Sequence, residues 1–434
     1  MARFPLASAK RLKVWVALLA GSLVLSGCVG SGSMRPPRRV AQAPAAAPAE
    51  PQFEADIPSE GAPESPSSAY AAGPAPMPGP MGSGMTIGNG PVRVALILPL
   101  SGQGQTAVAA QSLRNAADLA LSESQGGELT LLVKDDRGTP EGARDAASQA
   151  VTEGAELILG PLFAGSVQAA GQVARQTGKP IIAFSTDASV ATRGIYLLSF
   201  LVQAEVDRIV SFAASQGRRS IAALVPETTY GRVAEAQLQE AAARQGLRIV
   251  AVERYPAGQP QGAVQRLARV IGGPSAQADA LFLPENGDVL PVVAQALQGV
   301  GFNPQQVKPL GTGVWNEPRV FALPALQGSW FSAPDNRGFD AFATRYRARF
   351  NTDPIRLATL SYDAVTLAAA LTRVQGSQRF AEGVLTNPAG FAGADGVFRF
   401  RADGTNDRAL AVQEIRNGAA VMVSGAPKTL VAGN

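Results

Sequence analysis

The chain has 434 residues, with 38 Lys and Arg against 34 Asp and Glu, no histidine and a single cysteine. Without histidine, Ser-His-Asp and Cys-His catalysis and the commonest transition-metal ligand are excluded. The formal charge of +4 arises entirely within residues 1–27, so the rest of the chain is neutral and lacks the basic patch that would predict nucleic-acid binding.

The first 27 residues have the organisation of an export signal. Four cations precede an apolar stretch at residues 14–25 that is too short to span a membrane. The sequence LSGC, which ends at Cys28, resembles the bacterial lipobox. This resemblance implies cleavage before Cys28, lipidation of that cysteine and attachment to a membrane without spanning it. An ordinary signal peptide with a chance cysteine is the alternative.

Bacterial sorting rules bear on which membrane holds the anchor. Val29, rather than aspartate, follows Cys28, and by resemblance to those rules we expect the periplasmic face of the outer membrane, with the inner membrane as the alternative. Residues 29–90 contain twelve prolines and twelve alanines, a composition that buries too little apolar surface to fold. With Cys28 they form a predicted lipidated, disordered linker, 28–90, that holds the remainder away from its membrane.

From Pro91 onward, short apolar runs alternate with helix-like segments, which predicts parallel α/β architecture. The run VRVALILPL at 92–100 predicts a buried strand, and LTLLVKD predicts the next, ending near Asp135. Thr139 followed by Pro140 predicts the N-cap and first turn of a helix. Because open parallel sheets bind ligands beyond the carboxyl ends of their strands, we looked for function in the loops that follow strands.

The order of several segments resembles the type I periplasmic binding proteins of the leucine-binding kind. The segments that carry this resemblance are VALILPLSG, LILGPLFAGSV, KPIIAFSTDASV, AALVPETTYGR, the stretch 339–371 and the stretch 393–418. The resemblance implies two doubly wound α/β lobes joined by three crossovers, near residues 202, 330 and 392. Lobe one would comprise about 91–202 and 330–392, and lobe two about 203–329 and 393–434.

A ligand of such a protein lies in the cleft between the lobes. In the first lobe, GPLFAGS begins a helix whose N–H groups could hold an anion, with Ser166 among them. Amino-acid-binding members place a hydroxyl in this loop, whereas this chain has Ala164 and Gly165 there. The remaining candidates for ligand contacts come from later loops: Ser185, Thr186, Asp187, Tyr230, Asn286 and Trp315. Glu285, Asp288 and Glu317 are candidate partners for a ligand ammonium.

Two features of the sequence resemble those of enzymes. GQGQTA at 102–107 matches a dinucleotide fingerprint, but nicotinamide cofactors are scarce outside the cytoplasm. Asp135 and Asp136 are adjacent carboxylates, but successive strand residues point to opposite faces, so they make a poor catalytic pair. We therefore expect no enzyme activity, no cofactor and no metal site.

Two binding functions remain. One is a lipoprotein activator of a penicillin-binding protein, which the long linker favours because it could reach across the cell wall to a peptidoglycan synthase. The other is the solute-binding lipoprotein of an ABC importer for amino acids or amides. The sequence favours the first.

Overall fold

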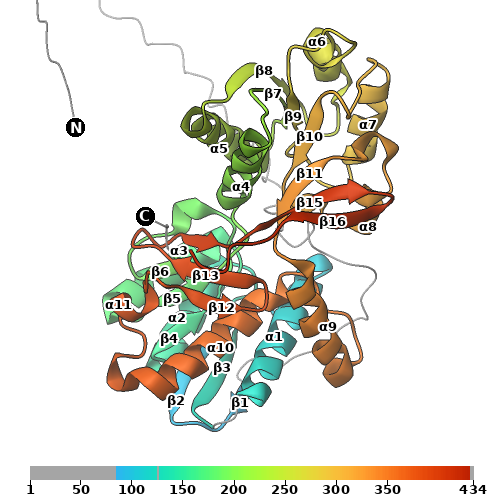
Figure 1. The fold of residues 1–434 in the computed structure, drawn as a ribbon. Coiled ribbons are helices and arrows are strands. Elements are labelled where there is room, and N and C mark those ends of the chain that lie inside the picture. Colours follow the sequence, from blue (N-terminus) through green and yellow to red (C-terminus); the bar gives the residue numbers. More distant parts are fainter. Residues whose placement is uncertain (1–84, 125–126, 431–434) are drawn as a thin grey trace, which may run out of the picture. The chain divides into compact units, whose positions relative to one another are not determined.

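The computed structural model describes residues 85–124 and 127–430, so the predicted signal peptide, the lipidation site and residues up to 84 lie outside the described residues. The described chain is mixed α/β and contains two large, mainly parallel sheets (Figure 1). Each sheet is the centre of one lobe. Within the described ranges, no helix has the length and apolar character needed to cross a membrane.

The sheet of lobe one has six strands in the order β1-β3-β2-β4-β5-β6. All of its pairs are parallel except β1 with β3. In β2 every residue but Arg93 is buried, as expected for a strand covered on both faces. The strands are β1 (Met85–Gly88), β2 (Val92–Leu98), β3 (Leu129–Asp135), β4 (Leu157–Leu159), β5 (Ile181–Ala183) and β6 (Ile195–Leu197).

Helices cover both faces of this sheet. Helices α1 and α10 pack together, as do α2 and α3, and the apolar clusters beneath them form two separate layers. The predicted cap of α2 is confirmed, because the Thr139 hydroxyl accepts a hydrogen bond from the N–H of Gly142 at 3.0 Å and Pro140 occupies the first turn. The lobe-one helices are α1 (Gln105–Glu123), α2 (Pro140–Thr152), α3 (Ala164–Thr177), α9 (Asn336–Phe350), α10 (Ala358–Gln375) and α11 (Glu382–Leu385).

Strand β1 corrects the expected end of the linker. Residues Met85–Gly88, assigned by composition to the 28–90 segment, pair antiparallel with Thr130–Val133 at the edge of lobe one. The side chains of Met85 and Ile87 are partly buried against the core. Short apolar positions between glycines are a weak strand signal, and a partner more than forty residues away stabilises them.

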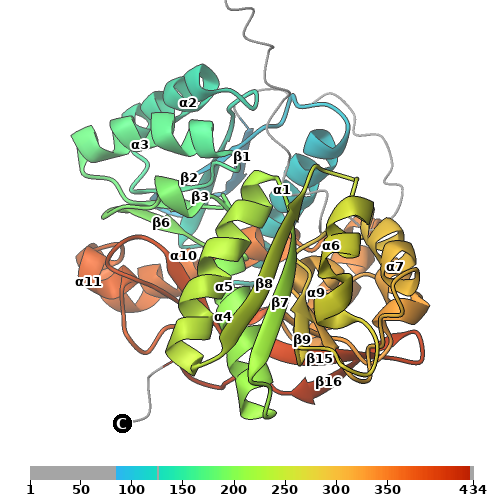
Figure 2. The ribbon, with the colours of Figure 1, turned by 90° about the horizontal axis from the view of Figure 1, so that it is seen from above.

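The sheet of lobe two has seven strands in the order β16-β15-β11-β10-β9-β7-β8, of which β15 and β16 are antiparallel. Figure 2 shows α4 and α5 on one side of β7 and β8, and α6 and α7 on the other. The strands are β7 (Ser220–Pro226), β8 (Arg248–Tyr255), β9 (Ala280–Phe282), β10 (Lys308–Gly311), β11 (Trp330–Ala333), β15 (Ala411–Arg416) and β16 (Ala419–Ser424). The helices are α4 (Val202–Ser215), α5 (Thr229–Gln245), α6 (Gln261–Ile271), α7 (Leu290–Gln298) and α8 (Pro318–Phe321).

The last crossover lies later in the chain than expected. Strand β11 belongs to the lobe-two sheet, so the chain returns to lobe one just after Ala333, close to the crossover expected near residue 330. A third, small sheet of β12 (Phe391–Gly393), β13 (Gly396–Phe400) and β14 (Asn406–Arg408) places Phe398 and Phe400 in the lobe-one core. The last crossover therefore follows Arg408, not residue 392. Long-range aromatic packing decides this assignment, and the local pattern does not reveal it.

Candidate functional site

The loops after β7 and β10 meet at the carboxyl ends of the lobe-two strands. Tyr230, in the first turn of α5, has its hydroxyl 2.6 Å from the hydroxyl oxygen of Thr312, which follows β10. The next N–H along the chain, that of Gly313, donates to the carboxylate of Glu205 at 3.0 Å. Glu205 lies in the first turn of α4 and is buried. Three elements distant in sequence are thus joined at one point.

A second carboxylate, that of Glu285, lies after β9 at the same end of the sheet. It accepts a hydrogen bond from the Tyr255 hydroxyl at 2.6 Å and one from the N–H of Asn286 at 2.8 Å. The indole N–H of Trp315 donates to the Glu285 carbonyl oxygen at 3.1 Å. The loops that follow β8, β9 and β10 are therefore held together around Glu285.

The electrostatics of this region are those of an acidic, partly desolvated site. Burial raises the pKa of Tyr230 well above its usual value, and the charge of Glu205 raises it further. The pKa of Tyr255 is raised by burial and then by the charge and hydrogen bond of Glu285. Both phenols therefore keep their protons at neutral pH. The two carboxylates that act on these phenols are themselves buried, Glu205 being 2% and Glu285 5% exposed.

In lobe one, the loop after β4 leads into α3. Helix α3 begins at Ala164 without a side-chain cap, and Gly160-Pro161 precedes it as a cis peptide. The first N–H groups of α3 thus have no side-chain acceptor from the residue before the helix. The ring of Phe163 approaches Gly138, which follows β3. Two lobe-one loops therefore come together at the carboxyl ends of their strands.

The loop after β5 contains three of the predicted site residues. The Ser185 hydroxyl accepts from the N–H of Asp187 at 3.2 Å, and the Asp187 carboxylate accepts from the N–H of Ser189 at 2.9 Å. Ser185 is buried, Thr186 is partly buried and Asp187 is exposed. The structure therefore brings Ser185 and Asp187 together, and both side chains also fix the loop backbone.

The structure corrects two of the expected ligand contacts. Ser166 is 1% exposed, and its hydroxyl donates to the Thr139 carbonyl oxygen at 3.3 Å, because the third position of α3 points towards the start of α2. Trp315 is fully buried in the lobe-two core, where its ring lies over Gly311. Only a glycine leaves room for that ring. Neither side chain is available to a ligand in this structure.

Asn286 and the two remaining acids have structural partners. The Asn286 side chain accepts from the N–H groups of Asp288 and Val289, at 2.9 and 3.3 Å, just before α7. Asp288 and Glu317 both form ion pairs with Arg319. Of the three acids considered for a ligand ammonium, Glu285 alone lies in the cluster with Tyr255.

Sequence reasoning missed Glu205, Tyr255 and Thr312. Glu205 stands in an amphipathic helix, where a glutamate is typical of a solvated face, yet it is 2% exposed. Tyr255 and Thr312 directly end or follow strands, and that position was the available signal. The residue they contact cannot be inferred from spacing, because each partner lies 30 or more residues away.

Hydrogen bonds also link lobe two to lobe one beside the second crossover. The side-chain amides of Asn316 and Asn336 exchange hydrogen bonds of 2.8 and 3.2 Å. Asn336 also accepts from Arg356 at 2.9 Å, and Arg356 forms a buried ion pair with Asp395. This chain of contacts fixes the position at which the chain leaves β11 and enters α9.

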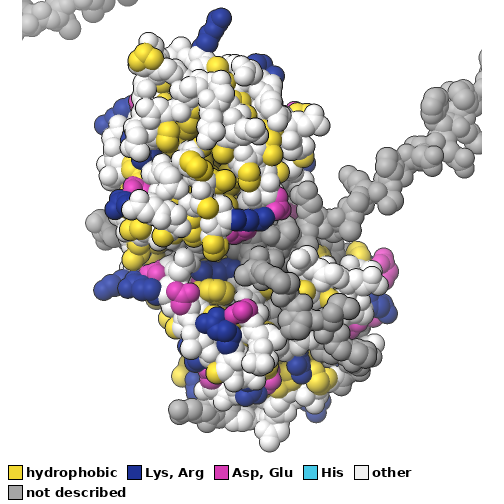
Figure 3. All heavy atoms as spheres, turned by 90° about the vertical axis from the view of Figure 1, so that its right-hand side faces the viewer, with side chains coloured by type: hydrophobic (Ala, Val, Ile, Leu, Met, Phe, Trp, Pro, Cys, Tyr) yellow, Lys and Arg dark blue, Asp and Glu magenta, His cyan; other side chains and the backbone are white. Residues whose placement is uncertain are grey.

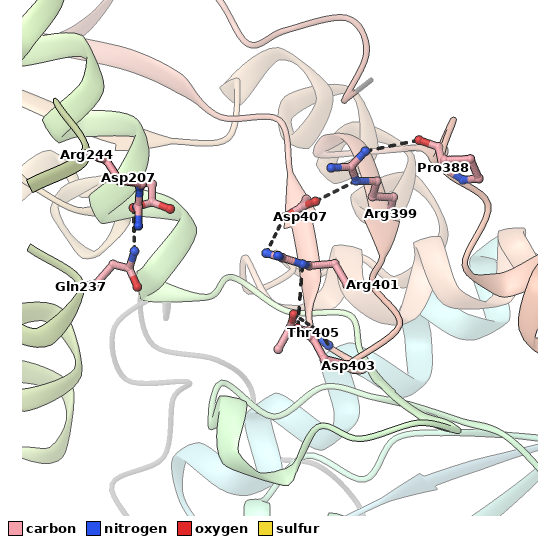
Figure 4. A network of polar contacts seen from close by, with 9 residues as sticks. All are labelled: Asp207, Gln237, Arg244, Pro388, Arg399, Arg401, Asp403, Thr405 and Asp407. Atoms are coloured by element: carbon pink, nitrogen blue, oxygen red, sulfur yellow. Dashed lines mark hydrogen bonds and ion pairs between the residues drawn. The ribbon is translucent and has the colours of Figure 1, made fainter. Parts of the chain in front are cut away.

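An open cavity of about 420 Å³ lies elsewhere, between α4 and α5 on one side and β13 and β14 on the other. In Figure 4, Asp207 contacts Gln237 and Arg244, while Asp407 contacts Arg399 and Arg401. The lining carries more positive than negative charge, because it contains two aspartates, Asp207 and Asp407, and four arginines, Arg208, Arg244, Arg399 and Arg408.

Comparison with known proteins identifies the family. The chain belongs to the periplasmic binding proteins, whose family it matches over residues 91–420. This is a family of ligand-binding proteins, and membership implies a periplasmic location. Comparison with curated protein sequences gave no match.

Solved structures agree with this assignment of the fold. A branched chain amino acid ABC transporter periplasmic ligand-binding protein from Burkholderia xenovorans shares 16% identity with a TM-score of 0.63, covering 79% of this chain and 97% of that one. A branched-chain amino acid transporter substrate binding protein from Streptococcus pneumoniae, in complex with isoleucine, shares 19% identity with a TM-score of 0.55, covering 77% and 99%. A solute binding protein of an ABC transporter from Rhodopseudomonas palustris, in complex with 3,4-dihydroxy benzoic acid, shares 19% identity with a TM-score of 0.56, covering 77% and 96%.

Proposed function

We propose that this chain is a non-enzymatic solute-binding lipoprotein that captures a small amino-acid-like or amide ligand, as the receptor of an ABC importer does. The observation that carries this proposal is the cluster of Glu205, Glu285 and Tyr230 at the carboxyl ends of the lobe-two strands. That edge of a parallel sheet is where ligands of doubly wound folds bind. The proposal therefore favours the solute receptor, whereas the sequence alone favoured the activator of a penicillin-binding protein.

Each lobe contributes a different half of the recognition. In lobe two, Glu205 and Glu285 are themselves buried, 2% and 5% exposed, so they would act on a ligand ammonium through their negative charge rather than by direct contact. In lobe one, the first N–H groups of α3 and the partly buried Thr186 supply donors for a ligand carboxylate or amide oxygen. Such opposed charges would orient the ligand as well as bind it. The proposal implies a periplasmic head on the lipid anchor predicted at Cys28.

The test is a thermal-shift screen of the full-length protein in detergent against amino acids and their amides, followed by calorimetry. A ligand that binds only the folded state raises the melting temperature. Replacing Glu285→Gln should weaken the binding of an amino acid by roughly tenfold or more, because the buried negative charge that favours the ligand ammonium is lost. Asp288→Asn is the matched control, since Asp288 is exposed in the same loop and pairs with Arg319.

Two results would contradict this proposal. One is the absence of any melting-temperature rise at about millimolar amino acid or amide, concentrations at which even weak binding stabilises measurably. The other is an equal loss of affinity in Glu285→Gln and Asp288→Asn, which would place the ligand away from the Glu285 cluster.

A second candidate function is that of an activator of a penicillin-binding protein. Two features favour it, one at the start of α3 and one in the segment that precedes Met85. Ala164 and Gly165, the first two residues of α3, stand where amino-acid-binding members have a hydroxyl, and Ser166 is turned into the lobe. Before Met85, the proline- and alanine-rich segment is longer than docking to an inner-membrane permease requires. For this function, lobe surfaces rather than a ligand would contact the peptidoglycan synthase at the outer membrane.

A deletion of residues 31–80 that keeps Cys28 separates the two functions. It spares β1, which the folded lobe needs. An activator that must reach a synthase from its anchor should lose its cellular effect in intact envelopes, while its lobes still capture the detergent-solubilised bifunctional enzyme. A solute receptor should keep ligand binding and transport. Full activity of the deletion variant, together with ligand binding, would dismiss the activator function.

A further inference from the structure

Strand β16 forms one edge of the lobe-two sheet and, among the described strands, pairs only with β15. It exposes three consecutive large apolar side chains: Val421 is 37% exposed, Met422 43% and Val423 36%. Figure 2 shows β16 at the rim of its lobe, and on the face drawn in Figure 3 hydrophobic side chains gather on that lobe. An exposed apolar edge of this kind invites pairing with another strand.

The opposite edge of the same sheet is protected. Strand β8 carries Arg248, Glu253 and Arg254, of which Glu253 pairs with Arg266 and Arg254 with Glu235. Charges on an edge strand oppose pairing with other chains. No charged residue or proline occurs within β16, and residues 417–426 contain no charge at all. The two edge strands of this sheet therefore differ in charge: β8 carries charged side chains that oppose pairing with another strand, and β16 carries none.

We propose that β16 pairs antiparallel with β16 of a second copy of this chain, so that two seven-stranded sheets join across a two-fold axis. A strand without charge meets no like-charge repulsion when it faces itself, and it offers no charge that would select a different partner. Antiparallel pairing with an identical strand also closes the assembly after two copies and removes both open edges.

The register of β16 sets the expected strength of the dimer. The β15 pairing is regular from Ala419 to Met422 and shifts beyond Met422, opposite the step from Val412 to Gln413. The regular part of the edge is thus short, and pairing of so few residues buries less than a standard interface. We expect a concentration-dependent dimer rather than a permanent one. The inference is independent of any ligand.

Light scattering on the full-length protein in detergent micelles tests the dimer. The polypeptide mass should rise from that of one mature chain towards twice that value between about 1 and 100 μM, the range in which a weak complex forms. Val421→Lys should raise the dissociation constant by roughly tenfold or more, because two like charges then meet. Val374→Lys is the matched control, since Val374 is 70% exposed on α10, and it should change nothing.

Cysteine cross-linking locates the contact. Ala420, Val421 and Met422 are each replaced by cysteine, because a residue near the two-fold axis lies about 4.5–5.5 Å from its own copy, within disulfide range. The unsubstituted chain is the control for any cross-linking through Cys28, its only cysteine. Val250→Cys, in β8, should not cross-link. A mass of one copy at every concentration, equal dimerisation in Val421→Lys, or cross-linking at Val250→Cys as strong as in β16 would overturn the proposal.

Discussion

Helix α2 in lobe one and helix α5 in lobe two begin in the same way, but only one of them carries a residue of the candidate site. In each, a threonine hydroxyl accepts the N–H of a glycine three residues later at 3.0 Å: Thr139 with Gly142, and Thr228 with Gly231. The second helical residue differs. In lobe one it is the exposed Glu141, and in lobe two it is Tyr230.

The comparison separates scaffold from function. The threonine and the glycine recur because they solve the same problem, satisfying free N–H groups while the helix approaches the preceding strand closely. The position between them is free to vary, and in lobe two it holds a phenol that contacts Thr312. We therefore infer that residues at matching positions of the two lobes serve folding where they agree and ligand binding where they differ.

The largest expected effect comes from the two glycines. A β-carbon at Gly142 would collide with the carbonyl oxygen of Asp136, and one at Gly231 with that of Pro226. We expect Gly142→Ala and Gly231→Ala each to lower the free energy of unfolding by about 3 kcal/mol, the upper end of the usual cost of overpacking, measured by urea denaturation. Gly383→Ala is the control, since nothing lies near its added carbon. If either variant were as stable as the unsubstituted chain, the two helix starts would not share the same need for a glycine.

The second prediction concerns a charge that only lobe one has. Burial raises the pKa of Asp136 from 3.8 to about 6, whereas Pro226 occupies the matching place in lobe two. The folded state therefore binds the proton more tightly, so this contribution is fully present below about pH 4 and is lost as the pH rises through about 6. It amounts to on the order of 3 kcal/mol.

The measurement is the free energy of unfolding between pH 4 and 8 for the unsubstituted chain and for Asp136→Asn. The substitution should remove a decrease in stability across pH 4 to 6. Asp135→Asn, at the partly exposed neighbour, should leave that decrease in place. An identical pH profile for Asp136→Asn and the unsubstituted chain would mean that Asp136 ionises normally in the folded lobe.

The smallest effects should come from the caps themselves. Thr139→Ala and Thr228→Ala should each lower the free energy of unfolding by about 1 kcal/mol, the usual contribution of an N-cap hydroxyl. The effects should add in the double variant, because the two sites lie in different lobes. Thr177→Ala, near the end of α3, is the control. A loss in only one of the two cap variants would sharpen the comparison by showing that the lobes depend unequally on their caps.

The sequence predicts the locally determined features well. The Thr139 cap, Pro140 in the first turn and the buried run of β2 depend on neighbouring residues, so composition and spacing suffice. Contacts between distant segments escape the same reasoning. The burial of Trp315 requires the gap above Gly311, and the acidic environment of Tyr230 requires Glu205, which the sequence places on an ordinary amphipathic helix. The site could be located at the strand ends, but its partners could not be named.

The small strand β1 determines how mechanical load would reach the protein. Met85 pairs with Val133, near the carboxyl end of β3, so the upstream chain joins lobe one on the side of the strand-end loops. If Cys28 carries the proposed lipid anchor, tension from that anchor would act on the four residue pairs between β1 and β3 before it reached the core. Detachment of β1 would lengthen the tether while leaving the parallel strands intact, which would make this edge an extensible joint between the anchor and the binding lobes.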